Sequence, residues 1–298
     1  MTDAIVVAIL SGLAGMLGWG LADFFAKKTI DIVGDLATLA WAHIYGVIFL
    51  LSIVLIYNRS EHQTLTLPNG FKEFALLGFF GILQAFVYFF AYRAFGKGKL
   101  ALLNPVFSSY SGIVVLLSTI FFAEVIGVNQ LLCLLVIFAG IMSISLDRES
   151  LALKKIRLAK ISGMKEILIA AILGAVWTVL WGNFVIDKDW LVYAAIMYIF
   201  MTITILLICL IQRLKLNVLN AHTWKFFMLI GVSEVIAYVG VSLGYSVTSR
   251  TSIIAVLSAA FSVPTVILAH IFLKERITKF QISGVALVIT GVVAITLV

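Results

Sequence analysis

Residues 122–146, FAEVIGVNQLLCLLVIFAGIMSISL, align without a gap with residues 273–297, LKERITKFQISGVALVITGVVAITL. The offset between the two stretches is constant at 151 residues, from 122 to 273. The identical polar and glycine pairs at this offset are Glu124 with Glu275, Gln130 with Gln281 and Gly140 with Gly291. A shorter similarity joins LGWGLADF at 17–24 with VLWGNF at 179–184. The chain therefore contains two related halves.

The composition indicates a membrane protein. The 298 residues are 63% hydrophobic and 12% charged, whereas soluble proteins are about half hydrophobic and about a quarter charged. A transmembrane helix needs about 20 apolar residues, and the apolar runs have that length. We predict ten spans near residues 4–26, 34–57, 73–95, 100–122, 127–146, 166–187, 190–211, 223–246, 251–273 and 278–298. Because barrel strands alternate over about 10 residues, the predicted fold class is all-α integral membrane.

Basic residues are concentrated in every second connection. Of the 21 Lys and Arg residues, 17 follow the predicted spans with odd numbers. The other connections hold Arg59, Lys72, Lys188 and Arg250. By the positive-inside rule, this distribution predicts that both termini lie outside the cytoplasm. The net charge of +7 is therefore a topology signal, and we expect no nucleic acid as a partner.

The same distribution predicts two inverted five-helix repeats. The first five spans carry their basic connections after their own first and third spans, and the last five after their own second and fourth spans. We divide the chain into a first repeat at 1–146, a basic cytoplasmic linker at 147–165 and a second repeat at 166–298. The linker is expected to rest on anionic lipid headgroups. Inverted repeats are typical of secondary transporters, whose substrate site forms at the membrane midplane between the halves.

Three duplicated motifs carry a family resemblance. They are Trp19-Gly20 and Trp181-Gly182 in the first span of each repeat, the Glu of FFAEVIG and FLKERIT, and one proline in each fourth span, Pro105 and Pro264. Their order resembles the drug/metabolite transporter superfamily, specifically EamA-type transporters with two EamA repeats. Two features depart from the duplication. The prolines are not at equivalent depth, and Trp181-Gly182 is followed by Asn183-Phe184, where the first repeat has Leu21, Ala22 and Asp23.

The resemblance implies a central cavity lined by the first four spans of each repeat, with the fifth and tenth spans peripheral. It implies alternating access and favours export over import. The family transports amino acids, amines, drugs, sugars and nucleotide conjugates, so the resemblance leaves the substrate open.

Glu234 is the strongest candidate for a functional residue. It lies in the middle of the eighth predicted span, where a charged side chain costs about 2.5 to 3.5 kcal/mol and usually faces a cavity or a partner. At helical spacing, Tyr238, Ser242 and Tyr245 fall on the same face. The carboxyl group could bind a substrate amine or take up a proton. A protonated Glu that serves packing alone is the alternative.

Polar residues at similar spacing occur on other spans. The third span carries Gln84, Tyr88 and Tyr92, and the fourth carries Asn104 and Ser108. We predict that these residues bind substrate together with Glu234, although small hydroxyl residues in membrane helices often serve packing. The remaining substrate-binding candidates are Trp19, Trp181 and His43.

Four other ionisable residues have plainer interpretations. Asp23 is expected to form an i, i+4 pair with Lys27 near the cytoplasmic surface. Glu124 and Glu275, at span ends, are expected to cap or anchor helices. His270, in the ninth span, is a weaker candidate for proton relay than His43.

The sequence contains no P-loop, no HExxH and no glycine-flanked catalytic serine. We therefore predict no catalytic residue, cofactor or metal, and a gradient as the energy source. The predicted function is a secondary transporter, acting as an exporter, for a small metabolite such as an amino acid or an amine. The alternatives are a transporter of sugars or nucleotide conjugates, an intramembrane enzyme acting on a lipid-linked substrate, and a non-transporting membrane subunit.

The expected partners are the small-molecule substrate, membrane lipids and protons, with Glu234 as the proton-coupling candidate. The expected location is the plasma membrane, as a multi-pass protein that is a monomer or a homodimer.

Overall fold

A computed structural model describes residues 2–60, 65–145, 162–216, 223–275, 277–295 and 297. In this part of the chain the structure is helical, with no strand. The helices are α1 (Thr2–Val33), α2 (Asp35–Ser60), α3 (Gly70–Lys97), α4 (Leu100–Ser108), α5 (Tyr110–Phe122), α6 (Val128–Ser145), α8 (Met164–Phe184), α9 (Trp190–Ile211), α10 (Trp224–Val247), α11 (Thr251–Ala259), α12 (Ser262–Leu273) and α13 (Lys279–Ile295). Most of the predicted basic linker, at 146–161, lies outside the described residues.

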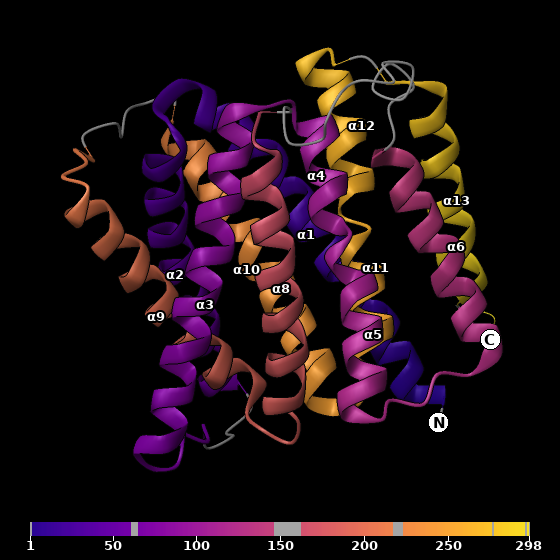
Figure 1. Cartoon of the computed structure of the whole chain (residues 1–298). Coiled ribbons are helices and arrows are strands. Elements are labelled where there is room, and N and C mark those ends of the chain that lie inside the picture. Colours follow the sequence, from indigo (N-terminus) through magenta and orange to yellow (C-terminus); the bar gives the residue numbers. More distant parts are fainter. Residues whose placement is uncertain are drawn as a thin grey trace.

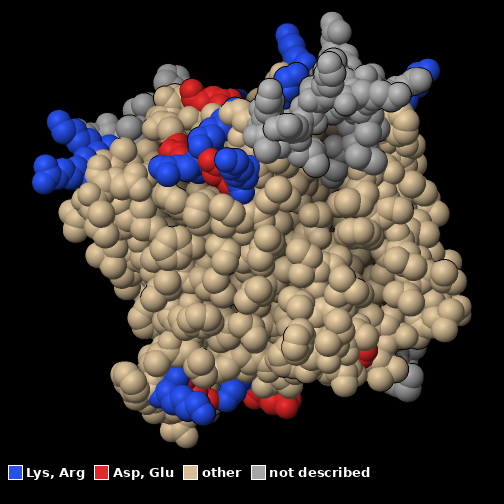
Figure 2. All heavy atoms as spheres, in the orientation of Figure 1, with Lys and Arg blue, Asp and Glu red and all other residues tan. Residues whose placement is uncertain are grey.

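The helices form one bundle (Figure 1). Within the described residues, eight helical segments are long and apolar enough to cross a membrane, and α6 and α13 are shorter apolar helices. Figure 2 shows charged side chains gathered at two opposite rims, with uncharged residues between them. This distribution matches a bilayer, whose core excludes charge. The protein is therefore a multi-pass integral membrane protein.

The fourth and ninth predicted spans are each broken near the middle, which differs from the continuous helices we predicted. The chain from 100 to 122 forms α4 and α5, which meet at Ser109. Pro105 lacks an N–H and cannot bond the carbonyl of Ala101. That carbonyl instead accepts a hydrogen bond from the Gln281 Nε2 at 3.2 Å. The chain from 251 to 273 is divided in the same way into α11 and α12, with Pro264 just after the break.

The two glutamates of the repeat motif make reciprocal caps. Glu124, just after α5, accepts hydrogen bonds from the backbone N of Ser252 at 3.1 Å and from its Oγ at 2.8 Å. Glu275, just after α12, accepts from the backbone N of Ala101 at 3.1 Å. Ala101 and Ser252 are each the second residue of a half helix, α4 and α11, where N–H groups lack intrahelical partners. Their numbers also differ by 151, so the caps follow the sequence repeat.

The two caps lie at opposite ends of the bundle. In Figure 1, α4 and the end of α12 are toward the top, whereas α5 and the start of α11 are toward the bottom. Burial raises the pKa of the Glu124 carboxyl, and its bonds to Ser252 partly oppose that shift. The expectation that both glutamates cap or anchor helices is confirmed.

Helices α6 and α13 pack against each other through glycines, at one side of the bundle (Figure 1). A Cβ added to Gly140 would lie 2.7 Å from the carbonyl oxygen of Gly284, and one added to Gly284 would lie 2.6 Å from that of Gly140. The two backbones are therefore in contact, as small residues allow in membrane helices.

Helix α10 approaches α2 equally closely. A Cβ added to Gly231 would lie 2.5 Å from the carbonyl oxygen of Ala42 and 2.6 Å from the backbone N of Gly46. Gly231 is three residues before Glu234, and Gly46 is three residues after His43. The contact therefore sets the distance between those two ionisable side chains.

Candidate functional site

Glu234 lies at the centre of a buried polar cluster. Its side chain is fully buried. Tyr92, on α3, donates to its Oε1 at 2.9 Å, and Tyr198, on α9, donates to its Oε2 at 3.2 Å. Both carboxyl oxygens therefore have a hydroxyl donor, and each donor comes from a different helix.

His43, on α2, completes this cluster. Its Nε2 is 3.6 Å from the Glu234 Oε2 and has no hydrogen-bond partner, and its Nδ1 lies 2.9 Å from the carbonyl oxygen of Leu39. The imidazole ring stacks on Tyr198, with ring centroids 5.3 Å apart. Four helices therefore bring a carboxyl, an imidazole and two phenols together inside the bundle.

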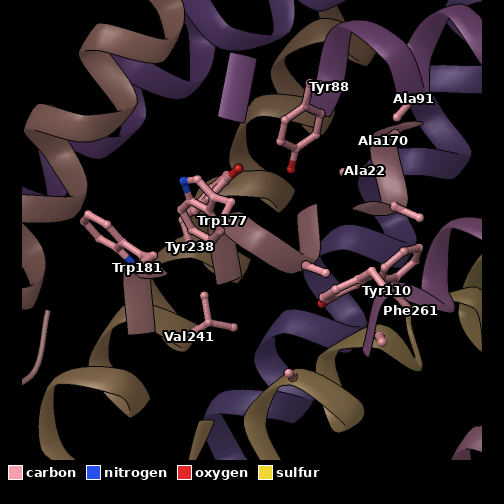
Figure 3. Packing of buried hydrophobic residues seen from close by; sticks show 14 of the residues in the cluster. Ala22, Tyr88, Ala91, Tyr110, Ala170, Trp177, Trp181, Tyr238, Val241 and Phe261 are labelled. Carbon is pink, nitrogen blue, oxygen red and sulfur yellow. The ribbon is translucent and has the colours of Figure 1, made fainter. Parts of the chain in front are cut away.

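A second layer of polar contacts joins α3 and α10. The Gln84 Nε2 donates to the hydroxyl of Tyr238 at 2.6 Å. The Tyr238 ring packs edge-on against Tyr198 at 5.5 Å and against Trp177 at 6.0 Å. Figure 3 shows Tyr88, Trp177 and Tyr238 in the buried interior. The stripes predicted on the third and eighth spans therefore face each other.

A small cavity of about 30 Å³ adjoins this layer. Its lining residues are Trp19, Asp23, Gln84, Val87, Tyr88, Phe107, Tyr110, Gly174, Trp177, Thr178 and Phe261. One water needs about 10 to 15 Å³, so the space holds about two waters. Glu234 and His43 are not among its lining residues. In this conformation the space is small, so a metabolite larger than a few waters requires the cavity to widen.

Asp23 lies in the wall of this cavity, which corrects the prediction for this residue. Its side chain is 4% exposed, and its Oδ2 accepts from the Nδ2 of Asn104 at 2.5 Å. Lys27 pairs instead with Asp31 at 2.8 Å. The reason is that α1 continues to Val33, so the water-facing end of the helix begins after Asp23. An acid inside an apolar run was the signal that could have identified this residue.

The other predicted site residues lie outside the Glu234 cluster. The Trp181 Nε1 donates to the Oγ of Ser242 at 3.3 Å. Tyr245 lies beside Gly182, eleven residues along α10 from Glu234 and therefore about 16 Å away. Ser108 donates to the carbonyl of Asn104 on its own helix. Trp19 is partly buried, and its Nε1 has no hydrogen-bond partner.

Several residues of the interior were not among the predicted site residues, including three with ionisable side chains. These three are Asp23, Tyr198 and Tyr110. Tyr198 lies in a strongly apolar span, where Thr202 is its polar neighbour at i+4, and this short pattern was not used as a signal. His270 lies at the exposed end of α12, where its Nδ1 is 2.7 Å from the carbonyl oxygen of Glu275. It is therefore outside the buried cluster.

A wider polar cleft of about 540 Å³ opens at one rim, between the start of α3 and the connection from α8 to α9. The Lys188 Nζ lies 2.5 Å from the Oε1 of Glu73, which ties the two elements together. Within the described residues, no group of three or more His, Cys, Asp or Glu side chains could hold a metal ion.

Comparison with known proteins identifies the family of the chain. No curated protein sequence matches the chain. A solved structure, described only as the crystal structure of a protein, is similar over 97% of this chain and 96% of its own, with a TM-score of 0.73 and 18% identity. That likeness shows the fold alone. The model of the EamA-like transporter family matches residues 6–146 and 161–297, and the chain therefore belongs to the EamA-like transporter family.

Proposed function

We propose that the protein is a secondary transporter that moves a small metabolite, such as an amino acid or an amine, by alternating access. The observation that carries the proposal is the Glu234 cluster, in which a fully buried carboxyl group contacts side chains from three other helices. Intramembrane ionisable residues are expensive and mark substrate or proton pathways. The small volume of the cavity beside the cluster supports a cycle in which the bundle must widen to admit substrate.

The proposed architecture is ten spans in two inverted repeats, at 1–146 and 166–298, joined by a basic linker at 147–165. Helices α6 and α13 have 18 and 17 residues. At 1.5 Å per residue they are about 26 to 27 Å long, close to the bilayer core of about 30 Å. The reciprocal caps of Glu124 and Glu275 support the inversion, because equivalent residues make the same contact at opposite ends.

The proposed setting is the plasma membrane, with both termini outside and export as the direction of transport. The Lys and Arg distribution supports the orientation, and the family resemblance supports the direction. Membrane lipids, the substrate and protons are the proposed partners, and the protein acts as a monomer or a homodimer.

Glu234 is the proposed proton-coupling residue. Its two tyrosine donors stabilise the charged form, and loss of a proton can be relayed through the unpartnered Nε2 of His43. The substrate-binding residues are proposed to be those of the facing stripes on α3 and α10, with Asn104, Ser108, Trp19, Trp181 and His43. Binding of the substrate and protonation of Glu234 would then shift the same conformational equilibrium in opposite directions.

Counterflow tests the proposal directly. Wild-type protein in proteoliposomes loaded with unlabelled amino acids and amines should take up a labelled member of the same panel in a saturable manner. Glu234→Ala should lose this exchange, whereas Glu166→Ala, which removes a rim carboxyl paired with Lys97, should retain it. Failure of every compound in the panel, with folded protein, contradicts transport of this substrate class. Chemical conversion of a candidate substrate would instead favour an enzyme.

The reciprocal caps provide a second prediction, about the access equilibrium. Glu124→Gln should favour opening at the end of the bundle where α5 meets α11, and Glu275→Gln should favour opening at the other end. Each substitution keeps one acceptor oxygen but removes a charge. A hydrogen bond to a charged group contributes roughly 1.5 to 3 kcal/mol, so the equilibrium should shift about tenfold or more.

The measurement uses Thr178→Cys, in the cavity wall, in a background with Cys133→Ala and Cys209→Ala. Its rate of modification by a membrane-impermeant maleimide is measured from each side of the membrane. The two glutamate variants should change the two rates in opposite directions. Equal shifts in the same direction would show that the caps stabilise the fold and do not control access.

A further inference from the structure

Asp23 is a buried carboxyl group without a cationic partner. Within the described residues no ion pair includes it, and its hydrogen-bond donor is the neutral amide of Asn104. A carboxyl group in a membrane interior is costly unless a partner compensates it. The nearest basic residue along α1, Lys27, is occupied by Asp31 and by the carbonyl oxygen of Phe95 at 2.9 Å.

The cavity that Asp23 borders is walled by aromatic rings. Six of its lining residues are aromatic: Trp19, Tyr88, Phe107, Tyr110, Trp177 and Phe261. Figure 3 shows Tyr110 beside Phe261 and, across the interior, Tyr88 and Trp177. Aromatic faces attract cations, with about 2 kcal/mol or more at desolvated sites. A carboxyl group within such walls is the arrangement that binds an ammonium ion.

Two polar groups in the same wall are unpaired. The Gln84 amide uses one of its polar atoms to bond Tyr238, and its Oε1 has no partner. If the amide were turned over, its NH₂ group would be the unpaired one. The Nε1 of Trp19 also has no partner, whereas that of Trp177 donates to the carbonyl oxygen of Phe80 at 3.1 Å. A ligand with an ammonium group and one neutral acceptor would satisfy Asp23, Gln84 and Trp19 together.

The wall lacks the groups that an amino acid requires. Among the described residues, no Lys, Arg or His lines the cavity, so the carboxylate of a zwitterion would be desolvated beside Asp23 without a counter-charge. Like charges at close range in a low-dielectric interior repel strongly. The site therefore discriminates between the two substrate classes that the proposed function leaves open.

We propose that this cavity is the substrate site for a small monocationic ammonium compound with a neutral hydrogen-bond acceptor, and that Asp23 is its counter-charge. The proposal rests on the transport function proposed above and narrows its substrate class. It also separates two roles. Asp23 binds the ammonium group, while Glu234, which does not line this cavity, is the proton-coupling residue.

Three small compounds of matched size test the charge requirement: ethanolamine, glycine and ethylene glycol. Their binding to the full chain in lipid nanodiscs is followed by tryptophan fluorescence, since Trp19 and Trp177 line the cavity. Ethanolamine should give a saturable change at neutral pH. Glycine should bind at least about tenfold more weakly, equivalent to about 1.4 kcal/mol, and ethylene glycol should give no saturable change.

Variants assign the contacts. Asp23→Asn, which keeps an acceptor for Asn104, should weaken ethanolamine binding at least about tenfold. Asp31→Asn, on the same helix but at the surface, should leave it within about twofold. Trp19→Phe should weaken binding of ethanolamine but not of ethylamine, which lacks the hydroxyl acceptor. This last comparison remains informative if Asp23→Asn does not fold.

Three results would overturn the proposal: unchanged ethanolamine binding in Asp23→Asn, equal binding of glycine, or equal losses for ethanolamine and ethylamine in Trp19→Phe. The outcome is distinguishable from a failure of the proposed function. Counterflow of another compound without ethanolamine binding would reject this site and retain transport. Binding of ethanolamine that depends on Asp23, without movement of any compound, would retain the site and reject transport.

Discussion

Glu234→Gln should abolish substrate transport driven by a proton gradient while leaving substrate exchange intact. The glutamine has nearly the same shape, and its Oε1 can still accept from one tyrosine. Its NH₂ group can donate to the other tyrosine, because a phenol is both donor and acceptor. The fold of the cluster should therefore survive, whereas the carboxyl group that takes up and releases the proton is lost.

We expect the gradient-driven rate to fall by roughly 100-fold, the scale of removing a positioned proton-transfer group. The measurement compares uptake into proteoliposomes with an imposed pH gradient against counterflow without one. Glu166→Gln, at the rim beside Lys97, is the matched control and should keep both rates. Gradient-driven transport that persists in Glu234→Gln would reject the proton role, and parallel loss of counterflow would assign Glu234 to substrate binding or to folding.

Much of the fold could be predicted from hydropathy. The predicted span 190–211 coincides with α9, and the span 73–95 lies within α3. The lipid environment explains this success, because a backbone in hydrocarbon must satisfy its hydrogen bonds within its own helix. The breaks after Ser108 and Ala259 were not predicted, although Pro105 and Pro264 each remove an intrahelical N–H donor. The freed carbonyl of Ala101 is bonded by Gln281, which is 180 residues away.

The candidate site could be predicted less completely. Residues that share a helix face, such as Gln84 and Tyr88, were identified because helical spacing is a local property. Their partners on other helices were not, because packing decides which faces meet. Asp23 illustrates the difference. The local i, i+4 rule predicted an ion pair between Asp23 and Lys27. Tertiary packing instead places Asp23 against Asn104, and Lys27 pairs with Asp31.

Gly231→Ala should lower both the stability of the protein and its gradient-driven transport, because α2 and α10 pack closely at this glycine. The new Cβ would lie 2.5 Å from the carbonyl oxygen of Ala42, so α2 and α10 must move apart. Overpacking costs about 1 to 3 kcal/mol, and the upper end applies because the clash is with backbone. The same movement draws Glu234 away from His43, since both lie within one turn of the contact. Gradient-driven transport should therefore fall at least about tenfold, the equivalent of roughly 1.4 kcal/mol.

Gly78→Ala is the control, because it makes the same chemical change at a buried glycine of α3 where the new Cβ would meet Phe200 at an ordinary 3.7 Å. Replacing glycine with alanine in a helix stabilises it by roughly 0.5 to 1 kcal/mol, so this variant should unfold at the wild-type temperature or slightly above it and transport normally. Thermal unfolding in nanodiscs and proteoliposome uptake measure the two consequences separately. If Gly231→Ala lost stability but kept gradient-driven transport, close approach of α2 to α10 would serve folding alone, and the distance from His43 to Glu234 would have no part in coupling.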